Sequence, residues 1–226
     1  MRTARLVRAR SLTPGVRELT FDPGPGHGFV PGQWVNLFDA AGDKRSYSIA
    51  SAPRADGTFD LAVTHVPGGP MSTLLHALPI GAELRMADAQ GFFVMDPVVR
   101  PVLMVATGTG LAPFRAMLQH LVSTPPTVPI WLIAGHRTQA DLLYRDELEA
   151  LPLRTFRYWP TLSRGGPTWR GSKGWVQVHV PPALAALGAD VDVYVCGLTH
   201  MVHAVRDLCR RELGVPRKQV HAEKYD

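Results

Sequence analysis

A glycine-rich turn is the clearest candidate for chemistry in this sequence. Residues 107–114 (Thr-Gly-Thr-Gly-Leu-Ala-Pro-Phe) follow an apolar run and precede a helical pattern. Gly108 and Gly110 let backbone N–H groups approach a phosphate, and the N-terminus of a helix adds partial positive charge. Pro113 stands where the usual dinucleotide fingerprint has its third glycine. The turn indicates a nucleotide phosphate site, with a ligand-free glycine turn as the alternative interpretation.

A second candidate lies on a strand pattern in the first half. Arg45 and Tyr47 share one face of that strand, and Ser46 and Ser48 share the other, because side chains alternate. An arginine can bind a pyrophosphate and a tyrosine can stack on a flat ring from the same surface. The alternative is an ordinary solvated strand face.

Two further motifs are weaker taken alone. Residues 67–74 form a tight turn that leads into a short helix, with Gly69 in the turn and Ser72 or Thr73 expected as its N-cap. His200 and His203 are spaced to share a helix face, but no third metal ligand accompanies them. We therefore expect that the N-terminus of the short helix can bind an anion, and we expect no metal site.

The elements that position these residues change character near residue 97. Residues 1–97 contain short alternating runs, such as 16–21 and 60–64, separated by Pro-Gly and Asp-Gly turns. This pattern predicts an antiparallel six-stranded β-barrel, with one helix at 72–78.

From residue 98 onward, apolar runs alternate with helical patterns. The runs 101–106, 129–134 and 192–196 are typical of strands buried on both faces, and 139–151 and 201–213 are expected helices. Alternating strands and helices predict βαβ units and a parallel sheet. We expect two domains, 1–97 and 98–226, in an α+β chain whose second domain is α/β.

Composition limits the possible functions. Two cysteines among 226 residues exclude a disulfide framework and a four-cysteine iron–sulfur cluster. No apolar run reaches membrane-spanning length and no secretory signal is present, so we expect a cytoplasmic protein that does not associate with membranes. Residues 1–97 hold nine of the 24 basic and nine of the 19 acidic residues, so the other 15 and ten place the whole excess of +5 in residues 98–226. This excess favours an acidic partner or a polyanionic ligand, and nucleic acid is a lesser alternative without a supporting motif.

Taken in order, the motifs resemble those of the ferredoxin–NADP⁺ reductase-like flavoproteins. Arg45, Tyr47 and Ser48 match one family motif, and Gly69, Ser72 and Thr73 match the loop before the short helix. Gly108, Gly110 and Pro113 match the nicotinamide-side motif, while Cys196, Gly197 and Met201 match the Cys-Gly motif with its following methionine. The resemblance covers essentially the whole chain. It is strongest to bacterial ferredoxin or flavodoxin reductases, from residues 90–96 and the C-terminal residues 222–226.

The resemblance implies that the first domain binds FAD. Arg45 would bind the pyrophosphate, Tyr47 would pack on the flavin, and Ser48 would lie near its reactive nitrogen. Further FAD contacts are expected from the strand and the loop before the short helix: Ser46, His65, Val66, Gly69, Met71, Ser72 and Thr73. Tyr225 is the candidate to cover the flavin, although Asp226 follows it.

The second domain would bind the nicotinamide nucleotide. Its expected contacts are Thr107, Gly108, Thr109, Gly110, Pro113, Arg137, Ser163, Arg164, Cys196, Gly197 and Met201. Ser163 and Arg164 match the family site for the 2′-phosphate, and no acidic residue follows Leu162, so we expect NADPH. Trp175 stands where some relatives have a further arginine, with Lys173 near. Cys196 is expected to place the nicotinamide, and Glu223 to act as a proton relay or an electrostatic group.

The sequence therefore predicts an FAD-dependent enzyme that passes electrons from NADPH to ferredoxin or flavodoxin as a monomer. A reductase component of an oxygenase system, using NADH or NADPH, is the alternative. A flavin-binding module without activity is a third interpretation, and the intact set of Arg45, Tyr47, Ser48 and Cys196 argues against it.

Overall fold

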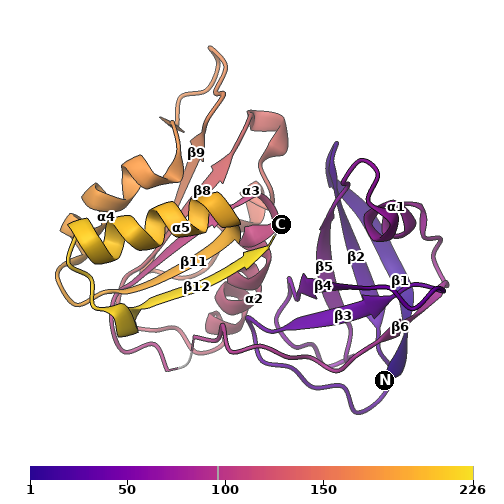
Figure 1. Cartoon of the computed structure of the whole chain (residues 1–226). Coiled ribbons are helices and arrows are strands. Elements are labelled where there is room, and N and C mark those ends of the chain that lie inside the picture. Colours follow the sequence, from indigo (N-terminus) through magenta and orange to yellow (C-terminus); the bar gives the residue numbers. More distant parts are fainter. Residues whose placement is uncertain (96, 226) are drawn as a thin grey trace. The chain divides into compact units, whose positions relative to one another are not determined.

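The chain forms two compact units in a computed structural model that describes residues 1–95 and 97–225 (Figure 1). The first unit contains Met1–Met95 together with Ala112–His120. The second contains the described parts of Asp96–Leu111 and Leu121–Asp226. Asp96, at the predicted domain boundary, and Asp226, after the candidate flavin-covering tyrosine, lie outside the described residues. The predicted division into 1–97 and 98–226 stays a prediction.

The first unit is built on an antiparallel sheet of six strands, as the sequence predicts. The strand order is β4-β3-β6-β1-β2-β5. A bridge between Ile49 and Leu61 joins the ends of this order and closes the sheet into a barrel. The strands are β1 (Arg2–Thr13), β2 (Val16–Asp22), β3 (Trp34–Phe38), β4 (Lys44–Ser48), β5 (Phe59–Thr64) and β6 (Glu83–Met86).

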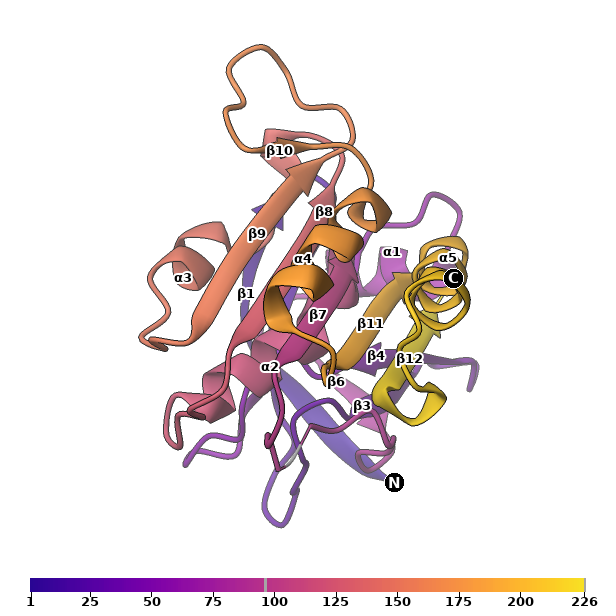
Figure 2. The same cartoon turned by 90° about the vertical axis from the view of Figure 1, so that its left-hand side faces the viewer.

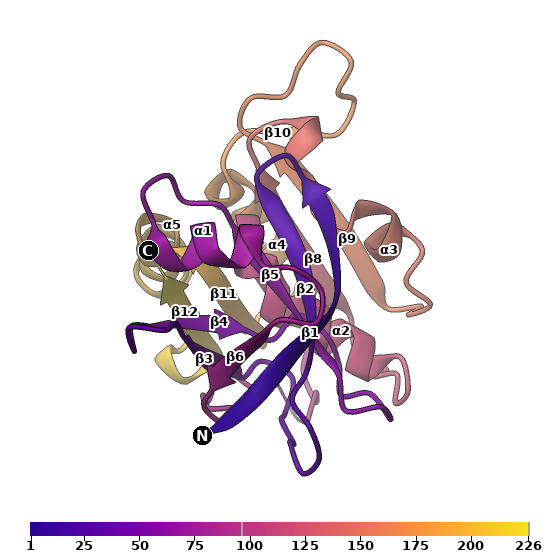
Figure 3. The ribbon, with the colours of Figure 1, turned by 90° about the vertical axis from the view of Figure 1, so that its right-hand side faces the viewer.

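The barrel interior is a single apolar core. Fully buried side chains include Phe21, Phe59 and Leu61, and the rings of Phe21 and Phe59 stack with centroids 6.0 Å apart. Helix α1 (Pro70–Ala77) follows β5 and lies beside it (Figure 3), and its Leu75 belongs to the same core. The helix begins two residues before the predicted start, because the fixed φ of Pro70 suits the first helical position.

The second unit contains a parallel sheet of six strands in the order β10-β9-β8-β7-β11-β12 (Figure 2). Three of the strands confirm the predicted apolar runs: β7 (Val102–Thr107), β8 (Ile130–His136) and β11 (Asp192–Leu198). The others are β9 (Phe156–Leu162), β10 (Ser172–Lys173) and β12 (Val220–Tyr225). The central position of β7 explains its continuous burial.

Two helices cover one face of this sheet. Figure 2 shows α4 (Val180–Leu187) and α5 (Thr199–Asp207) on one face of the sheet. Their side chains share one core with those of β7, β8 and β11. The remaining helices are α2 (Leu111–Leu121), which continues the glycine turn, and α3 (Arg145–Glu149).

Two predicted helices are interrupted. The predicted helix 139–151 contains a 3-10 turn, Gln139–Asp141, and then α3, with Tyr144 between them at φ +52°. The Asp141 carboxylate accepts hydrogen bonds from the backbone and the hydroxyl of Thr138, which closes that first turn. The predicted helix 201–213 ends its α-helical part at Asp207 and continues as the π-helical turn Leu208–Glu212.

Candidate functional site

Strand β4 presents the first set of predicted site residues. Arg45 is exposed, whereas Tyr47 packs against the barrel core that also contains Met71. On the other face, the Ser46 hydroxyl donates to the Asn36 side-chain oxygen of β3 at 2.8 Å, which confirms the predicted alternation. Burial raises the pKa of Tyr47 to about 12, against an opposing effect from Arg45, so the phenol is neutral.

The loop between β5 and α1 is held by one side chain. The Ser72 hydroxyl accepts from the Val66 N–H at 3.1 Å and lies 3.1–3.2 Å from the carbonyls of Gly69 and Val66. A Cβ at Gly69 would lie 2.9 Å from this hydroxyl oxygen, which explains the glycine. Gly69, rather than Ser72 or Thr73, occupies the N-cap, and the Thr73 N–H donates to its carbonyl. The predicted side-chain N-cap is therefore wrong, because Pro70 starts the helix earlier.

The remaining predicted residues of this unit lie near that loop or on α2. His65 directly follows β5, and its ring lies 5.2 Å from the ring of His76. Val66 is exposed and Met71 is buried. Pro113 is the third residue of α2.

In the second unit, two glycine turns meet at the carboxyl edge of the sheet. The 3-10 turn Gly108–Gly110 follows β7, and Gly197 lies near the end of β11. A Cβ on Gly110 would lie 2.2 Å from the Cys196 carbonyl oxygen, and a Cβ on Gly197 would lie 2.3 Å from Thr107 Oγ1. Both backbones approach so closely that only glycine fits at either position.

A polar atom without a partner lies beside this contact. Thr107 Oγ1 is buried and forms no hydrogen bond among the described residues. The Met201 methyl group borders the same space, 2.9 Å from the position of a Gly197 Cβ. A buried hydroxyl without a partner at a glycine-lined helix N-terminus fits a bound nucleotide.

Four predicted residues come together at this edge. Cys196 pairs with Glu223 in the register of β11 and β12, and Leu198 pairs with Tyr225. The Tyr225 hydroxyl donates to Thr109 Oγ1 at 3.3 Å, which ties the last strand to the glycine turn. The structure thus places Thr109, Cys196, Glu223 and Tyr225 at one end of adjacent strands, where nucleotides bind in open α/β sheets.

Burial keeps the Cys196 thiol and the Tyr225 phenol in their neutral forms. Burial, with a smaller effect from Glu223, raises the pKa of the Cys196 thiol well above its usual value. Burial likewise raises the pKa of the Tyr225 phenol. Both groups are protonated near neutral pH, so Cys196 is a thiol and not a thiolate nucleophile.

Two arginines lie on adjacent loops of the same edge. The Ser163 N–H donates to the His136 carbonyl at 3.0 Å, and the Arg164 N–H donates to the Arg137 carbonyl at 2.8 Å. Both arginines are exposed, and neither has a carboxylate within 4.0 Å among the residues described. The pair is available to an anion.

His136 was missed by sequence reasoning. It ends β8, and its Nε2 accepts from the Leu143 N–H at 3.4 Å. Burial lowers the pKa of His136 to about 4, so the ring is uncharged near neutral pH. Its position at the end of a buried strand is the one signal that could have identified it.

The described residues contain no group of three metal-ligating side chains, and among them no helix has the length and apolar character needed to cross a membrane.

Each unit matches a known domain family. Residues 3–94 match the oxidoreductase FAD-binding domain, and residues 104–207 match the oxidoreductase NAD-binding domain. The first match includes strand β4 and the loop before α1, and the second includes both glycine turns but not Glu223 or Tyr225.

Similar proteins span the whole chain. Ferredoxin–NADP reductase B of Sorangium cellulosum is 50% identical over an alignment of 236 positions, which covers 99% of this chain and 97% of that protein. The toluate 1,2-dioxygenase electron transfer component of Pseudomonas putida is 35% identical over 87% of this chain, but the match spans only 59% of that protein. Among solved structures, a ferredoxin NADP⁺ reductase from Neisseria gonorrhoeae with bound FAD and NADP has a TM-score of 0.83 at 22% identity, covering 98% of this chain and 97% of the other.

Proposed function

Because this chain belongs to the ferredoxin–NADP reductase family of flavoproteins, we propose that it carries electrons from NADPH, through FAD, to ferredoxin or flavodoxin. When bound, FAD supplies the conversion between two-electron hydride transfer and one-electron transfer. The residues of the protein would bind and orient both cofactors.

In the first unit, β4 and the loop before α1 would hold FAD. The exposed Arg45 guanidinium suits the pyrophosphate, and the neutral Tyr47 phenol beside the barrel core suits the flavin ring. Ser48 would lie near the reactive nitrogen of the ring. Because Thr73 N–H is used within the helix, the N–H groups of Met71 and Ser72 are the better candidates for a phosphate.

In the second unit, the carboxyl edge would hold the nicotinamide nucleotide. Gly108 has open space where a Cβ would stand, so the backbone there is accessible to a phosphate, and the Thr107 hydroxyl offers an unused polar atom. The neutral Cys196 thiol would pack against the nicotinamide, and the Tyr225 ring would cover the flavin. Arg137 and Arg164 would bind the 2′-phosphate, which favours NADPH over NADH.

The meeting of Thr109, Cys196 and Tyr225 at one edge is the observation that carries this proposal. The buried Cys196 thiol is uncharged, and the partly exposed Tyr225 phenol is uncharged too, which suits this edge to a flat neutral ring. If Cys196 acted as a nucleophile, it would have to be a thiolate instead.

An anaerobic absorption spectrum of the purified protein tests the proposal. We expect a flavin spectrum that bleaches on addition of NADPH, more slowly with NADH, and that returns when oxidised flavodoxin is added. A colourless protein, or a flavin that neither nucleotide reduces, would overturn it.

A reductase component of an oxygenase system is the second candidate, because several relatives carry such names. Both cysteines are buried and unpaired, and two thiols are too few for the iron–sulfur cluster that a longer component could carry. Faster reduction by NADH than by NADPH would favour this candidate.

Three finer proposals concern the compartment, the oligomeric state and the boundary between the domains. We propose a cytoplasmic protein, because buried free cysteines suit a reducing compartment. We propose that it acts as a monomer with a division into domains near residue 97.

A further inference from the structure

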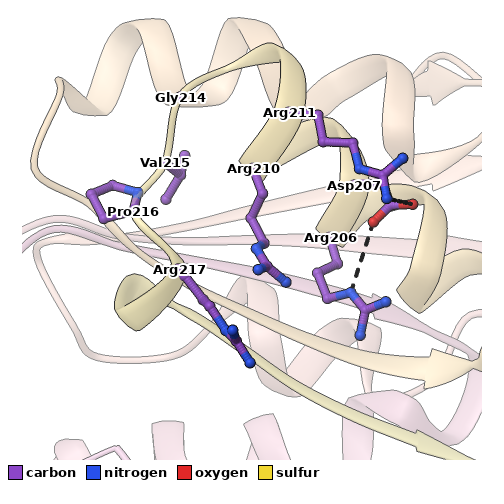
Figure 4. A pocket seen from close by; sticks show the side chains of 8 residues that line it. All are labelled: Arg206, Asp207, Arg210, Arg211, Gly214, Val215, Pro216 and Arg217. Carbon is purple, nitrogen blue, oxygen red and sulfur yellow. Dashed lines mark ion pairs between the residues drawn. The ribbon is translucent and has the colours of Figure 1, made fainter.

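A pocket rich in arginine lies where α5 returns to the last strand (Figure 4). After Asp207 the chain makes the π-helical turn Leu208–Glu212, turns at Gly214 with φ +69°, and enters β12 through the 3-10 turn Arg217–Gln219. These segments enclose a pocket of about 510 Å³, within the usual range for small-molecule sites.

Four arginines and one acidic residue line this pocket. Asp207 lies 3.9 Å from Arg206 Nε and 3.9 Å from the Arg211 guanidinium. Figure 4 shows the side chains of Arg206, Arg210 and Arg217 extending toward one another, whereas Arg211 turns away to the other side of Asp207. Three guanidinium groups therefore face a common space with one carboxylate at its margin.

Arg210 and Arg217 have no ion pair and no side-chain hydrogen bond within the described part of the chain. Arg206 and Arg210 are four residues apart, a spacing at which like charges repel. The partial negative charge at the C-terminus of α5 offsets part of the repulsion at Arg210. Arg217 lies in a separate turn and is not stabilised by this charge. The cluster is thus electrostatically unfavourable until an anion enters.

This pocket is distinct from the nucleotide edge. It adjoins the amino end of β12, whereas Tyr225, tied to the glycine turn, ends that strand. The strand has six residues, so the two sites are separated by roughly 20 Å along it.

We propose that this pocket binds a phosphate-bearing small molecule with at least two negative charges. Guanidinium groups pair with phosphate oxygens in a fork geometry, and three of them match the oxygens of a pyrophosphate or phosphate ester. The concave form of the pocket favours a small ligand over the flat surface of a protein partner.

Calorimetric titration with inorganic pyrophosphate tests the pocket directly. The FAD-loaded protein is titrated in one molar equivalent of NADP⁺, which occupies the nucleotide site and leaves little free nucleotide to compete for the pocket. We expect one pyrophosphate per chain, with binding weakened at least about tenfold by the double change Arg210→Gln and Arg217→Gln.

The control is Arg211→Gln, which removes an equal type of charge from the exposed side of Asp207 and should weaken binding less than about threefold. Because the double variant removes repulsion, it should fold with an unchanged flavin spectrum and a thermal midpoint no lower than that of the original protein.

Three results would overturn the proposal: no binding of pyrophosphate in one equivalent of NADP⁺, equal binding by the double variant, or loss of binding in Arg164→Gln alone. A fourth would be that the double variant raises the Michaelis constant for flavodoxin while pyrophosphate does not bind, which would assign the arginines to a protein surface. The binding measurement does not use turnover, so its failure leaves the proposed function standing.

Discussion

Arg137 and Arg164 are brought together by backbone hydrogen bonds between their loops, not by contact of their side chains. Each guanidinium therefore stays free for a ligand, and the 2′-phosphate of NADPH is the group that NADH lacks. We expect Arg164→Ala to raise the Michaelis constant for NADPH about ten- to 100-fold, the loss of one or two charge-assisted hydrogen bonds. The constant for NADH should change less than about threefold.

The matched control is Arg154→Ala, an exposed arginine just before the opposite, amino end of β9. It should leave both constants unchanged in steady-state assays. Equal increases for NADPH and NADH in Arg164→Ala would remove the case for phosphate recognition.

For single residues, the sequence predicts which residues belong to local motifs. It does not predict which residues from distant segments come into contact. Spacing indicated Gly108 and Gly110, and the resemblance to the family indicated Cys196, because these motifs are local. It could not show that Gly110 touches the Cys196 carbonyl, 86 positions away, since that depends on how β7 and β11 pair. The burial of His136 was not predicted for the same reason, because the elements that cover it are distant in the sequence.

Helix α2 is joined to the barrel strands by a buried ionic network. Arg115, 5% exposed, donates to the Ala50 carbonyl at 2.7 Å and to Asp60 at 3.1 Å, and lies 3.5 Å from Glu18. Asp60 also accepts from Arg54 and from the Thr20 hydroxyl. Both acids are fully or almost fully buried, so they depend on these partners.

We expect Arg115→Met to lower the free energy of unfolding by about 3–5 kcal/mol, because it leaves buried carboxylates with fewer partners. Arg5→Met, which breaks the exposed Arg5–Asp22 pair at 3.5 Å in the same unit, should change it by less than about 1 kcal/mol. Urea titrations followed by fluorescence measure both. A similar loss in the two variants would mean that the network adds nothing.

The same network sets the acid limit of this unit. Burial alone would raise the pKa of Asp60, but hydrogen bonds from Arg54, Thr20 and Arg115 outweigh it and hold the pKa at about 2. Because the folded value lies below the unfolded one, the carboxylate stabilises the fold above about pH 4. This stabilisation is lost as the pH falls from about 4 to about 2.

Helices and strands could be predicted where a single hydrophobic pattern runs through the whole segment. The apolar runs of β7, β8 and β11 are buried on both faces and were located to within two residues at each end. The helix predicted at 139–151 fails because apolar periodicity does not register the Thr138–Asp141 turn or the left-handed Tyr144. The π-helical turn after Asp207 could not be predicted either, because it adds one residue to a turn without changing the pattern of polar and apolar residues.

Across the whole molecule, charge is distributed by sequence half. The whole excess of +5 lies in residues 98–226, and the first 97 residues are balanced. The two-part organisation and the classes of cofactor were predictable, because each half carries its own local motifs and matches its own domain family. The electron acceptor was not, because a docking surface needs no fixed spacing in the sequence.

If the acceptor is an acidic carrier, the positive half should speed its approach by long-range attraction. We expect kcat/KM for flavodoxin at saturating NADPH to fall at least about tenfold as salt rises from about 0.01 M to about 0.5 M, over which the screening length shrinks from about 30 Å to only a few ångströms. The rate with an uncharged quinone as acceptor should fall far less over the same range. Parallel decreases for both acceptors would place the salt effect at the NADPH site, and a flat response for flavodoxin would show that the excess charge does not guide the carrier.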